Sequence, residues 1–361
     1  MCMTCDAQYD LIVIGGGPAG TAAAITAARR GANVLMLEAG AFPRHKVCGE
    51  FVSPEALATL RTLLSPAGFA ALTQDAPRIR DIRLLRNGLP EATIPFPEAA
   101  QSIPRYDLDA ALWNAALDAG VTCHDRMRAD AMSHEAALWE ITCGDTRFRS
   151  THLLLATGRW SNLPRRQPPP KASLWVGLKA QFYETNPAQS CDLYFFPGGY
   201  CGVQPVGDDC VNVAAMVRSD VAKSLPETFV RHAALALRAL QWTPVFAPLS
   251  CAPLVHGEPA TSLDGALLAG DAAGFVDPFV GDGISLALHS GCLAAQAIFY
   301  TPECAAEVYA ESYQRALAPA FRNAARLRRL TGAPSLIQRL ALGALRIPPV
   351  QKRVIAATRV R

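Results

Sequence analysis

Three glycines near the start of the chain have the spacing used for binding a pyrophosphate. Gly15, Gly17 and Gly20 follow the apolar run 11–14 and precede the small-residue segment 22–30. The first glycine of such a set allows a tight turn, the second lets the backbone approach phosphates, and the third lets the helix pack close to the strand. The amides and the dipole of the helix N-terminus then face the phosphates. This pattern predicts a dinucleotide site between a strand and a helix.

An acidic residue ends the next predicted strand. Glu38 follows the apolar run 34–37, at the place where a carboxylate accepts hydrogen bonds from ribose hydroxyls. The glycines alone are weak evidence for a dinucleotide site. The evidence is stronger when a strand precedes them and a helix, a second strand and an acid follow in this order. The uncharged stretch 11–28 has a borderline length for a membrane-spanning helix. Consecutive glycines followed by Pro18 would break such a helix.

Glu38 is compatible with both NAD and FAD. Two later segments help to choose between these cofactors. Residues 153–158 (LLLATG) form an apolar strand that ends in small residues, as expected where the chain turns beside a cofactor. Residues 267–284 (LLAGDAAGFVDPFVGDGI) form another strand that runs into Asp271, and its last two glycines open a helix. Taken alone, the second segment is also compatible with an ordinary turn and a helix N-cap.

Together these segments resemble the flavoprotein superfamily of p-hydroxybenzoate hydroxylase and geranylgeranyl reductase, over roughly residues 9–300. The resemblance implies bound FAD and an α/β fold. In that fold a Rossmann-type FAD-binding domain, with the glutathione reductase-like βαβ unit, is interleaved with an antiparallel-sheet substrate domain and followed by a C-terminal helical segment. By the same resemblance, Asp271 would bind the ribityl hydroxyls, and Gly281, Gly283 and Ile284 would lie under the flavin pyrimidine edge. A helix N-terminus there stabilises the negative charge of reduced flavin.

The segment 43–50 (PRHKVCGE) narrows the match, because many proteins similar to geranylgeranyl reductase carry Lys-x-Cys-Gly-Glu after the second strand. The resemblance places Cys48 and Gly49 close to the flavin ring, Arg44 near the diphosphate, and Arg105 at a helix start that touches FAD. Cys48 is the candidate catalytic residue, although a cysteine is often only a small buried side chain. The alternative for Arg105 is a solvated helix start. No metal ligand is expected, and the full set of expected cofactor contacts is Gly15, Gly17, Pro18, Ala19, Gly20, Glu38, Ala39, Arg44, Cys48, Gly49, Arg105, Gly158, Asp271, Gly281, Gly283 and Ile284.

Three flavin chemistries compete on this scaffold. Halogenation is disfavoured, because the W-x-W-x-I-P box of flavin halogenases is missing and no lysine occurs between Lys46 and Lys171. Aromatic hydroxylation by a monooxygenase is the runner-up. Ser161 and Arg165 match the hydroxylase motif that serves FAD and NADPH, but Thr157 stands where that motif has aspartate.

Reduction of a carbon–carbon double bond, or its reverse, is favoured. Residues 197–205 (PGGYCGVQP) resemble the Y-x-W-x-F-P segment that lines the lipid pocket of geranylgeranyl reductases, with Tyr200 and Pro205 matching. Gly202 and Gln204 replace the tryptophan and the phenylalanine, so we expect a different pocket, with room for a bulkier or ring-shaped substrate. The alternative interpretation of this segment is a plain hairpin turn at residues 197–199. We therefore expect an FAD-dependent oxidoreductase that acts on a hydrophobic isoprenoid or polyketide-type substrate, with Tyr200 in the substrate pocket.

The electron donor stays open. No second G-x-G-x-x-G occurs, so a stable second site for NAD(P)H is not expected. The alternative electron donors are NAD(P)H that binds only transiently, a ferredoxin, and a quinone. A non-enzymatic role as a flavin-binding assembly factor is disfavoured, because such a role would not need glycines shaped to the flavin ring.

Length and composition are those of an ordinary globular protein with room for two domains. The 361 residues are half hydrophobic and carry a net charge of +3. The first ten residues lack the basic region of a signal peptide, and the eleven cysteines lack framework spacing, which favours the cytoplasm. Cys2 and Cys5 form a C-x-x-C without a second pair, so metal binding is not expected there.

The C-terminal segment is basic. From Ala305 onward it carries eleven lysines and arginines but only two acids, Glu307 and Glu311. A basic amphipathic helix predicts peripheral contact with the inner face of a membrane. The alternative, which we favour, is a helix packed on the FAD-binding domain with a solvated basic face. Aromatic residues do not alternate with these bases, so nucleic acid is not expected as a partner. The apolar residues at helical spacing are Leu336, Ile337, Leu340, Ala341 and Leu345.

We expect the domains to be interleaved along the chain. The Asn87-Gly88 pair predicts a hairpin turn, residues 162–170 read as a proline-rich linker, and residues 225–240 predict one helix. The expected boundaries are 1–78, 98–165 and 252–300 for the FAD-binding domain, 79–97 and 166–251 for the substrate domain, and 301–361 for the C-terminal basic helical region.

Overall fold

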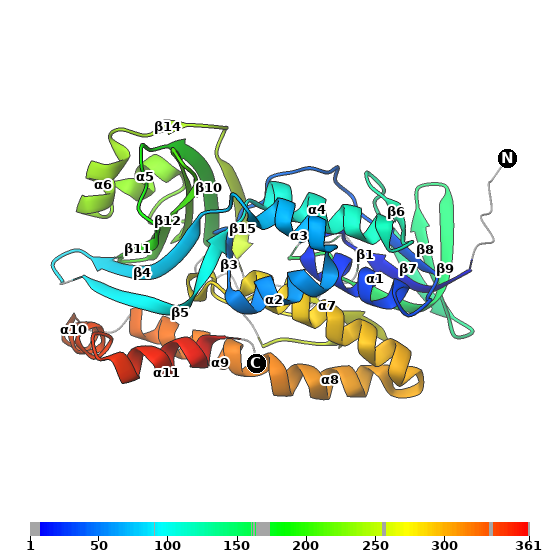
Figure 1. Cartoon of the computed structure of the whole chain (residues 1–361). Helices are drawn as coiled ribbons and strands as arrows, with labels where there is room; N and C mark the ends of the chain where they lie inside the picture. Colours follow the sequence, from blue (N-terminus) through cyan, green and yellow to red (C-terminus); the bar gives the residue numbers. More distant parts are fainter. Residues whose placement is uncertain are drawn as a thin grey trace.

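The computed structural model describes residues 8–89, 91–159, 161, 163, 174–254, 258–331 and 335–359. Two β-sheets lie at opposite ends of an elongated molecule, with helices between and beneath them (Figure 1). Two sequence predictions fall outside the described residues: the Cys2–Cys5 pair, and most of the linker 162–170 together with Arg165.

The first sheet contains the predicted dinucleotide-binding unit. β1 (Gln8–Ile14) lies between β2 (Val34–Leu37) and β9 (Thr146–Leu155) and pairs in parallel with both. Residues 11–14 of β1 and all of β2 are apolar and buried, as expected for parallel strands that are covered on both faces. The strand order is β16-β17-β9-β1-β2-β6, with β8 also paired to β9 and β7 to β8. The remaining strands are β6 (Thr122–His124), β7 (Ala131–Glu135), β8 (Leu138–Cys143), β16 (Ser262–Leu263) and β17 (Ala266–Leu268).

α1 (Pro18–Ala28) begins directly after the glycine turn and packs tightly on β1. A Cβ at Gly20 would lie 1.8 Å from the carbonyl oxygen of Gly15, so only glycine permits this approach. α4 (Arg105–Asp118) packs beside α1. Two shorter helices, α2 (Pro54–Leu63) and α3 (Pro66–Thr73), follow the loop that leaves β2.

α7 (Gly283–Tyr300) crosses α1 at a second glycine contact. A Cβ at Gly291 would lie 2.1 Å from the carbonyl oxygen of Ala19, so the two backbones touch at this crossing. By length and composition alone α7 could cross a membrane, but 56% of it is buried inside the protein. This burial is typical of a core helix.

The second sheet forms the other end of the molecule. Its order is β14-β10-β13-β12-β11-β4-β5-β3, with β15 paired to β10. The predicted hairpin is present as β4 (Arg78–Arg86) and β5 (Ala92–Ser102), and Gly88 in its turn has a φ of 71°. β4 pairs in parallel with β11. The other strands are β3 (Phe51–Val52), β10 (Trp175–Tyr183), β11 (Ser190–Phe196), β12 (Gly199–Gly207), β13 (Cys210–Arg218), β14 (Thr243–Pro244) and β15 (Leu249–Leu254).

The prediction of one helix over 225–240 is wrong. The chain forms α5 (Leu225–Phe229) and α6 (Ala233–Ala239) with a turn between them. His232 lies in that turn, is 4% exposed, and packs its ring edge-on against Tyr194 of the sheet. Burying the imidazole against the sheet interrupts the helix, and helical propensity alone carried no sign of that tertiary contact.

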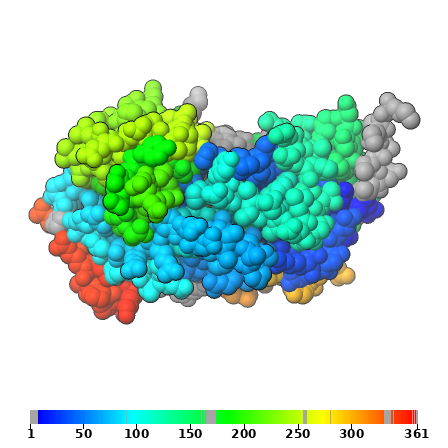
Figure 2. Space-filling model, turned by 45° about the horizontal axis from the view of Figure 1, so that its top comes forward, coloured from blue at the N-terminus to red at the C-terminus, as the bar shows by residue number. Residues whose placement is uncertain are grey.

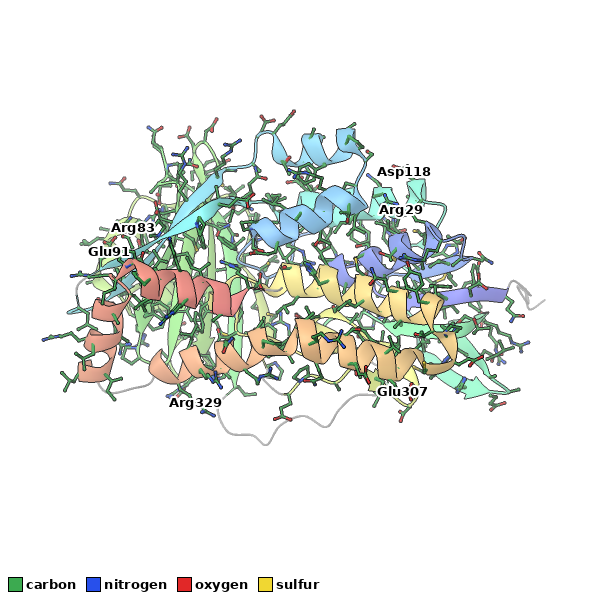
Figure 3. The ribbon with its side chains drawn as sticks, turned by 60° about the horizontal axis from the view of Figure 1, so that its bottom comes forward. Arg29, Arg83, Glu91, Asp118, Glu307 and Arg329 are labelled. Atoms are coloured by element: carbon green, nitrogen blue, oxygen red, sulfur yellow. The ribbon has the colours of Figure 1, made fainter. Side chains whose placement is uncertain are left out.

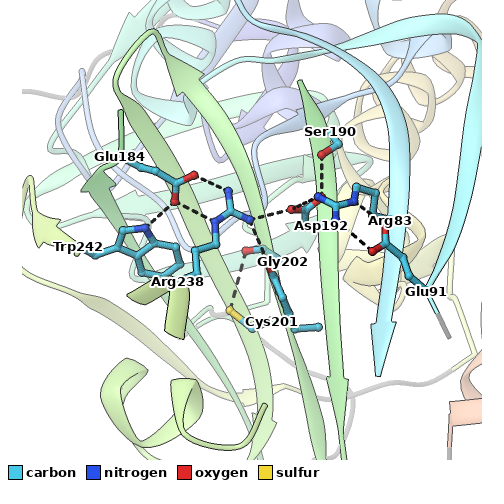
Figure 4. Close-up of polar contacts among 10 residues, drawn as sticks. Arg83, Glu91, Glu184, Ser190, Asp192, Cys201, Gly202, Arg238 and Trp242 are labelled. Carbon is cyan, nitrogen blue, oxygen red and sulfur yellow. Dashed lines mark hydrogen bonds and ion pairs between the residues drawn. The ribbon is translucent and has the colours of Figure 1, made fainter. Parts of the chain in front are cut away.

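A network of ion pairs joins α6 to the hairpin across one side of the second sheet (Figure 4). Arg238 of α6 lies 2.7 Å from Asp192 of β11 and 2.6 Å from Glu184. Arg83 of β4 contacts the same Asp192 at 3.3 Å and pairs with Glu91 at 2.7 Å. The side chain of Asp192 is almost fully buried, so two guanidinium groups compensate one desolvated carboxylate.

The C-terminal helices run along the side of the molecule that faces the viewer in Figure 3. Tyr309 in the first of them donates a 2.8 Å hydrogen bond to the carbonyl oxygen of Leu268, which fixes this helix to the first sheet. The later helices reach the second sheet (Figure 1). The helices are α8 (Ala305–Ala316), α9 (Ala318–Thr331), α10 (Ser335–Ala344) and α11 (Pro348–Thr358).

The expectation that the basic C-terminal helix packs on the FAD-binding domain is wrong for α10, which lies against the β4–β5 hairpin. α11 also contacts the hairpin, but Arg359 at its end lies 3.5 Å from Asp282 of the predicted FAD-binding domain. Arg346 donates to the carbonyl oxygen of Glu91 at 2.7 Å, and Gln351 donates to that of Thr93 at 3.1 Å. The apolar inner sides of these helices cover the apolar side of the hairpin, which is a long-range match that helical spacing does not reveal.

The domain boundaries stay a prediction. β5 continues as far as Ser102 and pairs with β3, so the second sheet also includes short stretches that we assigned to the FAD-binding domain.

Candidate functional site

A cavity of about 850 Å³ lies between the two sheets and is lined by residues from both. Every residue named above as an expected cofactor contact lines this cavity, with the exception of Gly20, and Tyr200 lines it too. Figure 2 shows the outline of the molecule dipping between the lobes of the two sheets. The structure therefore brings together residues that are spread over most of the sequence, while their individual roles stay predictions.

The three glycines of the first turn differ in what surrounds them. A Cβ at Gly15 would lie 2.3 Å from the carbonyl oxygen of Ala156, and Gly15 has a φ of 111°. A Cβ at Gly17 would approach only the guanidinium of Arg105, at 3.9 Å. Gly15 and Gly20 are therefore required by the protein's own packing, whereas the space beside Gly17 belongs to the cavity at the N-terminus of α1.

Glu38 is held at the end of β2 by three donors. Its carboxylate accepts hydrogen bonds from the backbone amides of Gly16 at 2.9 Å and Gly40 at 2.8 Å, and it pairs with Arg44 at 2.6 Å. Burial acts to raise the pKa of Glu38, but Arg44 and the two amides outweigh it, so the pKa lies below its ordinary value. Glu38 is therefore a fixed anion at the cavity edge.

Arg105 opens α4 over the glycine turn. Its guanidinium forms two hydrogen bonds, of 2.6 and 2.7 Å, with Asp109 one turn later, and Asp109 is fully buried. Burial opposes the charged form of Arg105, but Asp109 raises its pKa above the ordinary value. The solvated helix start that we kept as an alternative is therefore excluded, since Arg105 is a clamped cation in the cavity wall.

Asp271 lies in a tight turn after β17. The preceding Gly270 has a φ of 61° and donates its amide to the hydroxyl of Ser290 at 2.9 Å. The carboxylate of Asp271 lies 3.6 Å from Arg159, and burial raises its pKa against the opposing effect of that arginine. Sequence reasoning missed Arg159, which directly follows the Ala156-Thr157-Gly158 turn and shares the cavity wall.

The N-terminus of α7 is open toward the same cavity. A Cβ at Gly283 would meet nothing within 4 Å, and Gly281 has a φ of 73° with its Cβ position 3.0 Å from the ring of Phe51. Asp282 between them is fully buried and accepts a 3.2 Å hydrogen bond from the hydroxyl of Ser53. The free amides of this helix start are placed to receive a negatively charged group.

The Cys48-Gly49-Glu50 loop is fastened to the second sheet. Glu50 has a φ of 61°, and its buried carboxylate pairs with Lys179 and accepts a 3.1 Å hydrogen bond from Gln181. The amide group of Asn212 donates to the carbonyl oxygens of Cys48 at 3.2 Å and Gly49 at 3.0 Å. These two carbonyl contacts and the Glu50 pair fix the backbone beside Cys48.

Sequence reasoning missed all three partners of this loop. Lys179 and Gln181 alternate with apolar residues on β10, and Asn212 lies on the neighbouring β13. Polar side chains at inward positions of an otherwise apolar strand were the available signal.

Tyr200 lies on β12 and is buried in the cavity wall that the second sheet forms. Its hydroxyl donates to the carboxylate of Asp277 at 3.2 Å, and Asp277 lies 3.4 Å from Arg328 of α9. Burial raises the pKa of Tyr200 well above its ordinary value, and the adjacent Asp277 acts in the same direction. The room expected at Gly202 is partly filled, because a Cβ there would lie 3.3 Å from the side chain of Leu193.

A second, smaller cavity of about 160 Å³ lies between the hairpin and the C-terminal helices. Its lining is apolar except for Arg86 and Arg359. Ile82, Leu193 and Phe279 line both cavities, so the two spaces adjoin. We call this second space the apolar cavity.

Comparisons with known proteins place the chain in a family. A family model for FAD dependent oxidoreductases matches residues 10–49. The menaquinone reductase of Mycobacterium tuberculosis is 31% identical over 332 residues, which cover 81% of this chain and 77% of that protein. The chain belongs to this family of FAD-dependent oxidoreductases. The digeranylgeranylglycerophospholipid reductase of Methanocaldococcus jannaschii is 24% identical to the oxidoreductase, over 80% of this chain and 76% of that protein.

Solved structures agree with the fold of the oxidoreductase. A geranylgeranyl bacteriochlorophyll reductase-like protein from Thermoplasma acidophilum has a TM-score of 0.78 at 18% identity, covering 97% of this chain and 96% of that one. A flavin-dependent brominase has a TM-score of 0.80 at 19% identity, covering 98% and 93%. These identities show the fold alone. The fold class, the FAD cofactor and the enzyme class predicted from the sequence are confirmed.

The residues of the large cavity fit FAD. The only contact for a Cβ at Gly17 would be the guanidinium of Arg105 at 3.9 Å, and the N-termini of α1 and α7 open into the same cavity. Glu38 at one end and Asp271 at the other supply carboxylate acceptors for hydroxyl groups. Arg105 supplies a cation beside the glycine turn, where a diphosphate needs one.

Proposed function

We propose that this enzyme reduces a carbon–carbon double bond in the isoprenoid chain of a lipid. The observation that carries the proposal is the apolar cavity, which adjoins the large cavity through Ile82, Leu193 and Phe279. An apolar space that continues from a flavin site suits a hydrocarbon chain, because burying that chain is the main favourable term in its binding. The names of the relatives, a menaquinone reductase and digeranylgeranylglycerophospholipid reductases, support the same substrate class.

The protein's own residues supply binding and orientation. Gly17 and the N-terminus of α1 receive the diphosphate of FAD, Glu38 receives the adenosine ribose, and Asp271 receives the ribityl hydroxyls. The N-terminus of α7 at Gly283 stabilises negative charge at the pyrimidine edge. When bound and reduced, FAD supplies a hydride from N5 of its flavin ring.

Two groups flank the place where the substrate's double bond would lie. The hydroxyl of Tyr200 holds its proton, since burial keeps the pKa of the phenol high. Its hydrogen bond to Asp277 orients the ring at the junction of the two cavities. Cys48, in the fastened loop, lines the same cavity. In this proposal Tyr200 and Cys48 contact the substrate and exclude water from it.

The test is a reaction with chemically reduced enzyme. The protein is reduced anaerobically by dithionite, NADPH or NADH and incubated with a polyprenyl quinone, in ordinary and in deuterated water. The mass of the product is then measured by mass spectrometry. Air oxidation before the measurement returns any quinol to the quinone, so a lasting gain of two hydrogens marks a saturated carbon–carbon bond, and hydrogens that came from solvent appear as deuterium. Reduction of the flavin by NADPH or NADH identifies a nicotinamide donor, while dithionite, which reduces any flavin, is the chemical control.

Other products would overturn the proposal. An oxygen-dependent product that gains one oxygen atom establishes the monooxygenase alternative, and a halogen isotope pattern establishes a halogenase. The likeness to a brominase does not favour that outcome, because at 19% identity it shows the fold alone and the W-x-W-x-I-P box is missing from this sequence.

A further inference from the structure

α10 has apolar side chains on two opposite faces. Ala341, Leu342 and Leu345 line the apolar cavity on its inner side. Leu336 and Leu340, four residues apart and therefore on one face, are each 66% exposed on its outer side. A surface helix normally presents polar residues to water on the face opposite the core. The outer face of α10 departs from this pattern.

Ile337 extends the exposed apolar surface along α10, at 46% exposure. We define the outer patch as Leu336, Ile337 and Leu340.

The C-terminal helices that carry the outer patch are basic. No aspartate or glutamate occurs in the sequence after Glu311. Arg329 points away from α9 in Figure 3. The exposed bases of this region are Arg322, Arg326, Arg329, Arg339, Arg346, Lys352 and Arg353. An apolar helix face with a rim of arginine and lysine has the composition of helices that lie in the interface of an anionic bilayer.

A second copy of this chain is a poor occupant. A symmetric contact would place the same patch of each copy against the other. The basic rims would then face each other without acidic residues from this segment to neutralise them, and like charges across an interface are costly. Charge complementarity favours a surface of anionic lipid.

We propose that the outer patch of α10 docks on an anionic lipid bilayer, with Leu336, Ile337 and Leu340 below the headgroups and the exposed bases against the lipid phosphates. The inner side of α10 is the wall of the apolar cavity, so docking places that cavity next to the hydrocarbon of the membrane. If the proposed function holds, a lipid substrate enters beside α10. The docking itself does not depend on that function.

The experiment measures binding of the FAD-loaded protein to sedimented vesicles. Vesicles of phosphatidylcholine alone are compared with vesicles that also contain phosphatidylglycerol, at low and high salt. We expect binding to the anionic vesicles that falls with salt. The double variant Leu336→Glu/Leu340→Glu should bind about tenfold more weakly or worse, because each glutamate is repelled and the apolar contact is lost.

A matched control changes two exposed leucines on the opposite end of the second sheet. Leu237 and Leu240 of α6 are 69% and 79% exposed. Leu237→Glu/Leu240→Glu should bind vesicles like the unchanged protein. A second variant, Arg329→Gln/Arg339→Gln, keeps the apolar patch and should weaken both the binding and its dependence on salt.

Three results would overturn the proposal. The first is equal binding to neutral and anionic vesicles, or none. The second is unchanged binding by Leu336→Glu/Leu340→Glu. The third is a dimer in solution that this double variant dissociates, which would make a second copy the occupant. Reduction of a short, water-soluble prenyl substrate should be unchanged in the double variant, so a failure of the proposed function is recognised separately from a failure of docking.

Discussion

The ammonium group of Lys179 and the carboxylate of Glu50 form an ion pair inside the protein, and neither side chain is exposed. The two residues come from different parts of the fold: Lys179 lies on β10, and Glu50 ends the loop that carries Cys48. Glu50 also accepts the backbone amide of Arg105 at 2.9 Å. One carboxylate therefore joins the second sheet, the Cys48 loop and the first turn of α4.

Replacing Lys179 by methionine should be strongly destabilising. The variant leaves the Glu50 carboxylate buried without its cation, and removing one partner of a buried pair costs about 3–5 kcal/mol. Urea unfolding of the FAD-free protein measures the change. The double variant Lys179→Met/Glu50→Gln removes the stranded charge and should recover part of the loss. A single variant as stable as the unchanged protein would contradict the structural role of this pair.

Gly17→Val and Gly20→Val should fail in different ways. A side chain at Gly17 enters the cavity and blocks the diphosphate, so this variant should fold but remain colourless. A side chain at Gly20 collides with the Gly15 carbonyl oxygen at 1.8 Å, so that variant should not fold. Circular dichroism and the flavin absorbance distinguish the two. A yellow Gly17→Val protein would show that the diphosphate lies elsewhere.

Asp271→Ala should weaken FAD binding by roughly ten- to a hundredfold, since a hydrogen bond to a charged group contributes about 1.5–3 kcal/mol. Equilibrium dialysis of FAD measures the change. Asp271→Asn keeps an acceptor oxygen without the charge and should give an intermediate loss. Retention equal to that of the unchanged protein would place Asp271 away from the cofactor.

The pH dependence of stability should contain a contribution from Glu38. Its pKa in the folded protein lies below the ordinary value of 4.5. The stabilisation is therefore complete above 4.5 and is lost as the pH falls through the folded value, because the folded protein binds this proton less well than the unfolded chain. Glu38→Gln should lower the stability of the FAD-free protein at about pH 6, and the difference should narrow toward about pH 3. A difference that is constant over this range would contradict the assignment.

Cys48→Ser should change turnover or product pattern much more than FAD binding. Serine keeps the shape of the side chain but alters its polarity and acidity, while the backbone stays fastened by Asn212. Turnover is compared with the FAD dissociation constant, and Cys251→Ser, in the same cavity wall, is the control. If both variants leave turnover unchanged, Cys48 is only a small side chain of the wall.

Apart from Gly20, the residues that the sequence predicts as cofactor contacts line one cavity, and the determinants of that half of the site are local. Gly15 and Gly20 are required by the packing of one turn, Gly17 leaves space beside that turn, and Glu38 directly follows the paired strand. The opposite wall depends on contacts between distant segments. Lys179 and Glu50 are 129 residues apart, and their meeting depends on how β10 is placed against the Cys48 loop. No local pattern contains that information.

The same distinction explains the errors. The spacing of residues 225–240 is helical, but the burial of His232 against Tyr194 breaks the helix. The amphipathic pattern of α10 is present as predicted, yet its inner side meets the hairpin rather than the FAD-binding domain. In both cases the local pattern was correct, and the partner in space decided the outcome.

The crossing of α1 and α7 at Ala19 and Gly291 has a consequence for the choice of flavin. The backbones touch there, so the separation of the two helix N-termini is fixed by rigid elements rather than by loops. A flavin mononucleotide that reaches the start of α7 has no second phosphate and no adenosine for the turn at Gly17. We therefore expect the helix pair to discriminate between flavins by their length, independently of every residue that touches the isoalloxazine ring.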